Sequence, residues 1–138
     1  MGIILDTSLL IAAERGEWEV RTYVKGREEE PFGLSVISVS ELLQGVHRAD
    51  SEKRRLKRSA YVEKVIELFP IYPFDLAASR IYAEVWANLL GKGIQVGAHD
   101  LIIAATALSR GFSVASMDKR HFDKIEGLEF EWVRKREV

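Results

Sequence analysis

Short apolar segments alternate along the chain with longer segments whose apolar residues recur at helical spacing. The short segments are rich in β-branched, leucine and aromatic residues, and they predict strands at residues 2–5, 32–37, 70–74 and 112–116 and an edge strand at 128–133. The longer segments predict helices at residues 7–14, 17–26, 38–49, 51–68 and 101–109, and one more between Asp75 and Gly91. Ser38 and Glu41 have the spacing of a capping box for the helix that begins at residue 38.

Strands that alternate with helical crossovers predict an α/β fold, with a central, mostly parallel sheet and helices on both faces. A length of 138 residues suits one domain. There is no internal repeat and no linker long enough to separate a second domain. We therefore expect residues 1–138 to form a single domain, with residues 134–138 as a flexible tail.

Composition narrows the class of protein. The chain is 47% hydrophobic and 30% charged, as ordinary globular domains are. The absence of cysteine excludes a disulfide scaffold, a cysteine zinc site and a thiol nucleophile. The formal net charge is -1, so contact with nucleic acid requires local basic patches or a bound cation. The sequence begins with no signal-peptide pattern and has no apolar stretch of about 20 residues, which predicts a cytoplasmic protein without a membrane partner.

Four acidic residues fall where a parallel sheet gathers side chains. Asp6 follows the first strand and Glu41 lies one turn into the helix after the second strand. Asp100 opens a helix, and Asp118 follows the fourth strand. The carboxyl ends of parallel strands share one edge of the sheet, where ligands bind, and the helix at Asp100 must begin at that edge to lead into the next strand. We therefore expect the four carboxylates to converge in one cleft.

Each of these acids also has a structural explanation. Asp6 and Asp100 could be helix N-caps, because aspartate accepts hydrogen bonds from free backbone N–H groups and suits the helix dipole. Glu41 could be the capping-box partner of Ser38, and Asp118 could begin a turn. Capping explains each position separately, but it does not explain four acids at one edge. Several of them also lie in very apolar segments, where an unpaired charge is costly.

A cluster of carboxylates needs a cation. Oxygen ligands without cysteine or paired histidines favour hard ions, Mg²⁺ or Mn²⁺. One or two such ions promote phosphodiester hydrolysis by lowering the pKa of a bound water and by stabilising charge on the phosphoryl oxygens. A bound dication also reverses the local negative charge, which would otherwise repel a phosphate backbone. The predicted catalytic and metal-binding residues are Asp6, Glu41, Asp100 and Asp118.

Four segments contain these acids. They are Ile4-Leu5-Asp6-Thr7-Ser8, Ser40-Glu41-Leu42-Leu43-Gln44-Gly45, His99-Asp100-Leu101-Ile102-Ile103-Ala104-Ala105-Thr106-Ala107 and Ser116-Met117-Asp118-Lys119-Arg120-His121-Phe122. In this order, and over nearly the whole chain, they resemble the successive motifs of PIN domains. More narrowly, they resemble the VapC-type toxins of bacterial and archaeal type II toxin–antitoxin pairs.

The resemblance implies a PIN-like three-layer sandwich and an endoribonuclease that depends on Mg²⁺ or Mn²⁺. It also implies a homodimer that a small antitoxin protein neutralises. The residues that match the family's acids are Asp6, Glu41, Asp100 and, at the more variable fourth position, Asp118. Thr7 and Ser116 match the hydroxyl positions that orient the first and fourth acids, although many members have Thr-Asn where this chain has Ser116-Met117.

A basic run offers candidate substrate-binding residues. Lys53, Arg54 and Arg55 belong to it and could bind an RNA backbone, since cations near phosphates release counterions. The neighbouring Glu52 and Glu63 favour the alternative of a solvated helix face.

Histidine and leucine positions are the remaining candidates. His99, beside Asp100, could donate a proton or touch the substrate, although a polar surface position is the commoner role of such a residue. The other two histidines share no motif spacing with it, and no role is predicted for them. The apolar residues at 9–11 and 42–43 could form a groove for a helix of a partner protein.

Three alternative functions are weighed against a toxin nuclease. A phosphohydrolase with an aspartate nucleophile requires a second acid two residues after the first, and position 8 is serine. A receiver-type signalling domain also requires a pair of early acids. A non-catalytic RNA-binding or interaction module is expected to have lost one of the acids, and all four are present. A PIN-fold nuclease that is not a toxin and acts on other RNA or on DNA stays open.

Overall fold

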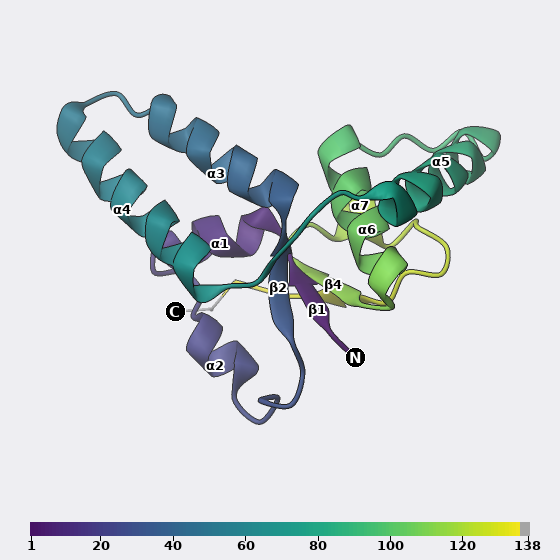
Figure 1. Cartoon of the computed structure of the whole chain (residues 1–138), viewed down its shortest axis with the longest axis horizontal. Helices are drawn as coiled ribbons and strands as arrows, with labels where there is room; N and C mark the ends of the chain where they lie inside the picture. Colours follow the sequence, from purple (N-terminus) through teal and green to yellow (C-terminus); the bar gives the residue numbers. More distant parts are fainter. Residues whose placement is uncertain (136–138) are drawn as a thin grey trace.

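The computed structural model describes residues 1–135, in which a five-stranded parallel sheet is flanked by seven helices (Figure 1). The strands are β1 Ile3–Leu5, β2 Phe32–Ser35, β3 Ile71–Tyr72, β4 Ser113–Ser116 and β5 Phe130–Trp132. The helices are α1 Thr7–Glu14, α2 Val20–Val24, α3 Val36–His47, α4 Glu52–Leu68, α5 Leu76–Gly91, α6 Ala98–Arg110 and α7 Lys119–Phe122. The strand order is β3-β2-β1-β4-β5, and every neighbouring pair is parallel.

Strand β1 lies in the middle of the sheet and is buried on both faces. Ile3 and Leu5 join a hydrophobic core with residues of α1, α3 and α4. Ile4 points the other way, into a second core with residues of α5, α6 and α7. Because successive side chains of a strand alternate between the faces of the sheet, an uninterrupted apolar run is what this central position requires. The predicted three-layer α/β sandwich is confirmed, and the sheet is parallel throughout.

Two helices begin earlier than the sequence predicted. Ser35 is the N-cap of α3, and its hydroxyl accepts a hydrogen bond from the backbone N–H of Ile37 at 3.3 Å. Ser38 is therefore inside the helix and fully buried, so the predicted capping box is wrong and β2 is shorter than expected. Helix α6 begins at Ala98, which places Asp100 in its first turn rather than at its opening.

The leucines proposed as a partner groove belong to the core instead. Leu9, Leu10 and Leu42 have exposed fractions of 0%, 1% and 7%. They pack together on one face of the sheet, because α1 and α3 lie side by side there. Of this predicted set, only Ile11 is exposed, at 37%.

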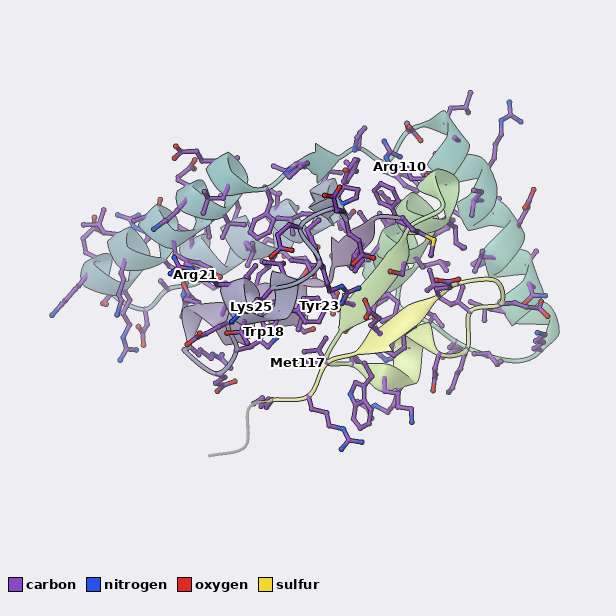
Figure 2. All side chains as sticks on the ribbon, turned by 90° about the horizontal axis from the view of Figure 1, so that it is seen from below. Trp18, Arg21, Tyr23, Lys25, Arg110 and Met117 are labelled. Atoms are coloured by element: carbon purple, nitrogen blue, oxygen red, sulfur yellow. The ribbon has the colours of Figure 1, made fainter. Side chains whose placement is uncertain are left out.

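Strand β5 is tied to the segment that contains α2. The Tyr23 hydroxyl donates to Oε2 of Glu131 at 2.9 Å, and the Arg27 guanidinium donates to both oxygens of the same carboxylate. Trp18 is buried with its ring 5.5 Å from that of Tyr23, and Figure 2 shows the two side chains near one another beside β5. Trp18 is thus part of the packing between α2 and the sheet, and its indole is covered.

Other features bear on predicted partners and on the predicted tail. In residues 1–135, none of the helices has the length and apolar character needed to cross a membrane. Lys135 Nζ lies 3.1 Å from Oε2 of Glu17, and the Arg134 guanidinium lies 4.4 Å from the ring centre of Trp132. The rest of the predicted tail, residues 136–138, lies outside the described residues.

Glycine at position 33 lets β2 and β3 approach closely. A Cβ atom there would lie 2.4 Å from the Tyr72 ring and 2.9 Å from the carbonyl oxygen of Pro70. Tyr72 belongs to the neighbouring strand β3, and Pro70 directly precedes that strand. The Pro70 carbonyl oxygen already accepts a hydrogen bond from the Leu34 backbone N–H. A side chain at residue 33 therefore cannot be accommodated without moving backbone.

We expect Gly33→Ala to lower the free energy of unfolding by about 1–3 kcal/mol, the usual cost of overpacking. Gly45→Ala is the matched control, because the nearest atom to its new Cβ is Arg58 Cδ at 3.9 Å. Inside α3, alanine favours the helix by up to about 1 kcal/mol over glycine. Urea denaturation measures both variants, and equal stabilities would contradict the close approach at Gly33.

Candidate active site

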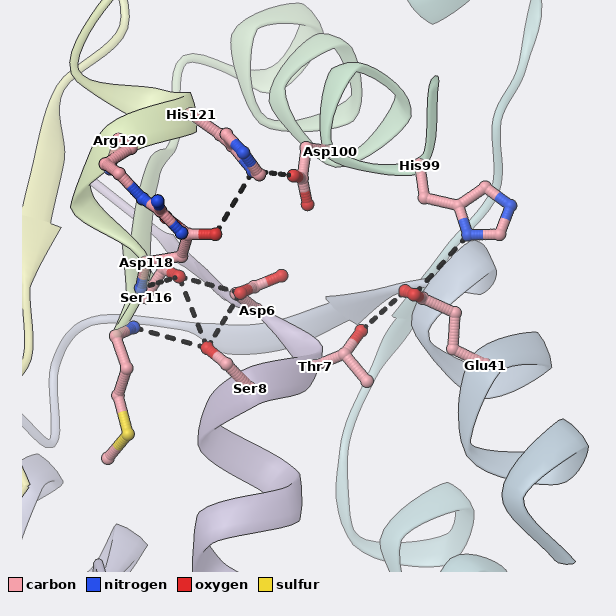
Figure 3. Close-up of polar contacts among 11 residues, drawn as sticks. Asp6, Thr7, Ser8, Glu41, His99, Asp100, Ser116, Asp118, Arg120 and His121 are labelled. Atoms are coloured by element: carbon pink, nitrogen blue, oxygen red, sulfur yellow. Dashed lines mark hydrogen bonds and ion pairs between the residues drawn. The ribbon is translucent and has the colours of Figure 1, made fainter. Parts of the chain in front are cut away.

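The four predicted acids surround one space at the carboxyl edge of the sheet (Figure 3). Asp6 follows β1 directly, and Asp118 follows β4, the strand paired beside β1. Glu41 comes from the second turn of α3 and Asp100 from the first turn of α6. The structure therefore brings together side chains that are up to 112 positions apart in the sequence (118 minus 6).

Asp6 is almost fully buried and is held by two serine hydroxyls. Ser8 and Ser116 each donate to its Oδ2 at 2.7 Å. The two hydroxyls in turn accept from backbone N–H groups, Ser8 from Met117 at 3.2 Å and Ser116 from Asp118 at 2.9 Å. This network fixes the end of β1 to the loop after β4, so the first and fourth acids have a set position relative to each other. Both hydroxyls donate to Oδ2, and neither donates to Oδ1 of Asp6.

Glu41 is oriented by a different hydroxyl. Thr7 donates to Oε1 of Glu41 at 2.8 Å and lies 2.9 Å from the buried Ser38 hydroxyl. The resemblance implied that Thr7 orients the first or fourth acid, whereas its side chain contacts Glu41. His99 is half-exposed, and its Nδ1 lies 3.4 Å from Oε2 of Glu41. His99 is thus at the edge of the acidic cleft.

His121 is a member of the site that sequence reasoning missed. Its Nδ1 lies 2.5 Å from Oδ2 of Asp100 and 3.1 Å from Oδ2 of Asp118. The available signal was the spacing of three residues from Asp118, which places two side chains on one face of a helical turn. That helical turn is α7, in a segment for which the sequence predicted no helix. Ser8 was also missed, although it stands two residues after Asp6.

Burial and mutual repulsion disfavour the charged forms of two of the acids. Burial raises the pKa of Asp6; hydrogen bonds from Ser116 and Ser8 lower it, and the charge of Glu41 raises it again. Burial likewise raises the pKa of Asp100, with a further increase from the charge of Asp6. In residues 1–135, Asp6, Glu41 and Asp100 form no ion pair with a lysine or arginine. The cleft therefore holds excess negative charge that its own cationic groups do not neutralise.

The donor atoms present fit a divalent cation. One ligand atom from each of Asp100, Asp118 and His121 lies within 4.8 Å of the other two. The buried carboxylate of Asp6 lies beside this group and is electrostatically coupled to Asp100. Carboxylates clustered at partial burial are the usual ligands of Mg²⁺ and Mn²⁺. The sequence predicted oxygen donors alone, and the structure adds an imidazole nitrogen.

The predicted basic run lies apart from the acids. Lys53, Arg54 and Arg55 begin α4, at the tip of the hairpin that α4 forms with α3, whereas the opposite end of α3 is at the sheet (Figure 1). Arg54 pairs with Asp50 at 3.0 Å, and Arg55 pairs with Glu52. An RNA contact at this tip stays a prediction.

The fold and the site together define a parallel α/β protein with an acidic cleft at the carboxyl edge of its sheet. Residues 3–128 match the family model described as PIN domain. Ribonuclease VapC1 of Rickettsia felis is 39% identical over 132 residues, which cover 94% of each chain. Ribonuclease VapC of Rickettsia bellii is 34% identical over 129 residues, again 94% of each chain. The chain therefore belongs to the PIN-domain family, and within it to the VapC group.

Solved structures agree with this assignment. The DNA-bound VapBC structure from Salmonella typhimurium superposes with a TM-score of 0.83 at 29% identity, over 95% of this chain and 97% of that one. VapBC-5 from Mycobacterium tuberculosis, a member of the VapBC family of toxin-antitoxin systems, superposes with a TM-score of 0.75 at 29% identity, over 96% and 98%. The predicted family is confirmed.

Asp6→Asn is expected to raise the melting temperature of EDTA-treated protein at pH 7. Burial holds the pKa of Asp6 in the folded state above its ordinary value of 3.8. The protonated carboxyl therefore stabilises the fold below pH 3.8, and this stability is lost as the pH rises through the folded-state pKa. The neutral asparagine avoids this loss. For a chain of this size, each 1 kcal/mol gained raises the melting temperature by about 3–4 °C.

Thermal melts between pH 4 and 8 measure this effect, and the advantage of the variant should shrink toward pH 4. The control is Glu84→Gln, which removes an exposed charge on α5 and should change the melting temperature little. A variant that melts lower than the parent at pH 7 would show that Asp6 is there to stabilise the fold.

Proposed function

We propose that this protein is an endoribonuclease that depends on Mg²⁺ or Mn²⁺ and is the toxin of a toxin–antitoxin pair. The proposal depends on one observation: four carboxylates from four separate elements face one cleft, and three of them have no lysine or arginine partner in residues 1–135. One buried and three partly exposed carboxylates of like sign repel one another, and a bound divalent cation offsets this repulsion. The relatives from both Rickettsia species are named as ribonucleases, which supports RNA as the substrate.

In the proposed mechanism, Asp6, Asp100 and Asp118 would hold the cation, and Glu41 faces the same space. When bound, the cation supplies a water of lowered pKa and stabilises negative charge on the phosphoryl oxygens. Ser8 and Ser116 keep the Asp6 carboxylate directed into the cleft. Hydrolysis adds the elements of water across one P–O bond of the RNA backbone.

Partners are proposed from the relatives and from the surface. The related solved structures are described as VapBC complexes, and we propose that a small antitoxin protein likewise inhibits this chain. We also propose a homodimer. Two large apolar side chains of α5 support it, since Trp86 is 52% exposed and Leu90 is 63% exposed.

Purified protein is expected to cleave RNA with Mg²⁺ or Mn²⁺ and to lose this activity in excess EDTA. Asp6→Asn should lower kcat by at least about 100-fold, the usual cost of removing one group that stabilises transition-state charge. The exposed acid Glu84 lies outside the cleft, so Glu84→Gln should retain the parental rate. Gel assays on total RNA and on single-stranded DNA measure the rate and the choice of substrate. Cleavage that continues in EDTA would exclude the metal mechanism.

Expression of the protein in a bacterial host is expected to slow growth. Asp100→Asn should restore the growth rate to that of cells with empty vector, because it removes a cation ligand and leaves the fold intact. Growth curves with matched expression levels, checked by immunoblotting, provide the measurement. If the variant were as toxic as the parent, growth inhibition would not come from catalysis.

A further inference from the structure

His121 lies between two of the acids in the cleft (Figure 3). Its Nδ1 is 2.5 Å from Asp100 Oδ2 and 3.1 Å from Asp118 Oδ2. The nitrogen therefore points into the group of acids, and one atom of the ring contacts carboxylates from two different elements. His99, the other histidine of the cleft, contacts a single carboxylate, and its Nδ1 is 3.4 Å from Glu41 Oε2.

The spacing of these three atoms matches a coordination shell. Neighbouring ligands of an octahedral cation at about 2.1 Å from the metal lie about 3 Å apart. The 3.1 Å separation of His121 Nδ1 from Asp118 Oδ2 already has this value, and the 2.5 Å separation from Asp100 Oδ2 needs to widen by only a few tenths of an ångström. All three atoms lie within 4.8 Å of one another.

The position of His121 is set by its neighbours in α7. Phe122, the next residue, is fully buried and stacks on Phe130 with ring centres 5.7 Å apart. At the start of the helix, Asp118 Oδ1 accepts a hydrogen bond from the backbone N–H of Arg120 at 3.1 Å, so that its Oδ2 is the oxygen that faces the imidazole. Both ends of this single helical turn are fixed, which holds the nitrogen at the acids.

We propose that His121 Nδ1 is a nitrogen ligand of the cation in this cleft, so that the site has a mixed nitrogen and oxygen donor set. This inference rests on the proposed metal-dependent function and specifies its cation. An imidazole nitrogen favours first-row transition ions over Mg²⁺, whereas carboxylates alone suit Mg²⁺. The cleft is therefore expected to prefer Mn²⁺ and, more strongly, Co²⁺ to Mg²⁺.

The test measures cation binding without RNA. Calorimetric titrations of the metal-free protein with Mg²⁺ and with Co²⁺ give the ratio of the two Kd values. In His121→Asn the ratio of the two Kd values should fall by at least about tenfold. Loss of a group that only supports a metal ligand already lowers metal affinity by about 10-fold or more. Asparagine places a hydrogen-bonding amide near the position of the histidine Nδ1. His121→Gln is a second variant for the case that His121→Asn does not fold. His99→Asn is the matched control and should leave the selectivity unchanged.

Pulsed electron paramagnetic resonance of bound Mn²⁺ detects nitrogen in the coordination shell directly. The parent protein and His99→Asn should show ¹⁴N coupling, and His121→Asn should not. If cations bind with the same selectivity and the same coupling after His121→Asn, the histidine is only a hydrogen-bond partner and the inference is wrong.

These outcomes are separable from those for the proposed function. Nitrogen coupling without RNA cleavage would reject the nuclease and keep the ligand. RNA cleavage with cation selectivity that does not depend on His121 would reject the ligand and keep the nuclease. Failure of the parent protein to bind any divalent cation would reject both.

Discussion

The site depends on a carboxylate that is buried without a cationic partner among the described residues. Asp6 ends the central strand of the sheet, and the hydroxyls of Ser8 and Ser116 hold its Oδ2 in place. Two hydroxyl donors partly offset the cost of burial, since the pKa of Asp6 remains raised. The fold therefore holds a carboxylate whose charged form is disfavoured by burial at the end of the central strand. The other three acids are arranged around it.

The other three acids differ in the side chains that contact them. Glu41 lies on the side of α3 and is held by Thr7, whereas Asp100 and Asp118 share one imidazole. Asp118 alone of the four acids has an arginine nearby, with Arg120 Nε 4.0 Å from its Oδ1, among residues 1–135. The other three acids have no lysine or arginine partner in that part of the chain, and the proposed cation site therefore extends to His121, a residue outside the four acids.

The sequence was sufficient to locate the acids because their positions follow from topology. An apolar run that ends in Asp6 has few interpretations other than a buried parallel strand, and the carboxyl ends of such strands share an edge. The three-layer order followed from the same alternation of strands and helices. These features can be predicted from local sequence patterns, without knowledge of tertiary contacts.

The wrong or missing predictions concern positions whose local structure depends on tertiary contacts. Ser35 and Ser38 are both acceptable N-caps for α3, and the choice depended on Ser38 being buried against Thr7. The contacts of His121 were not predicted because they depend on α7, a four-residue helix whose Phe122 is buried against Phe130. The leucines of α1 and α3 were assigned to a partner groove because the sequence does not show that these two helices pack against each other.

The strand order has a consequence for the newly synthesised chain. β4 pairs with β1 across more than 100 residues, and the loop that β4 leads into supplies Asp118 and His121. Contacts so distant along the chain form late, because a long loop must close before they gain any stability. A chain still emerging from the ribosome therefore contains three of the four acids, including Asp6, but no assembled cleft. Formation of the acidic cleft is in this way separated from the synthesis of its first three acids, because it waits for β4 to join the sheet.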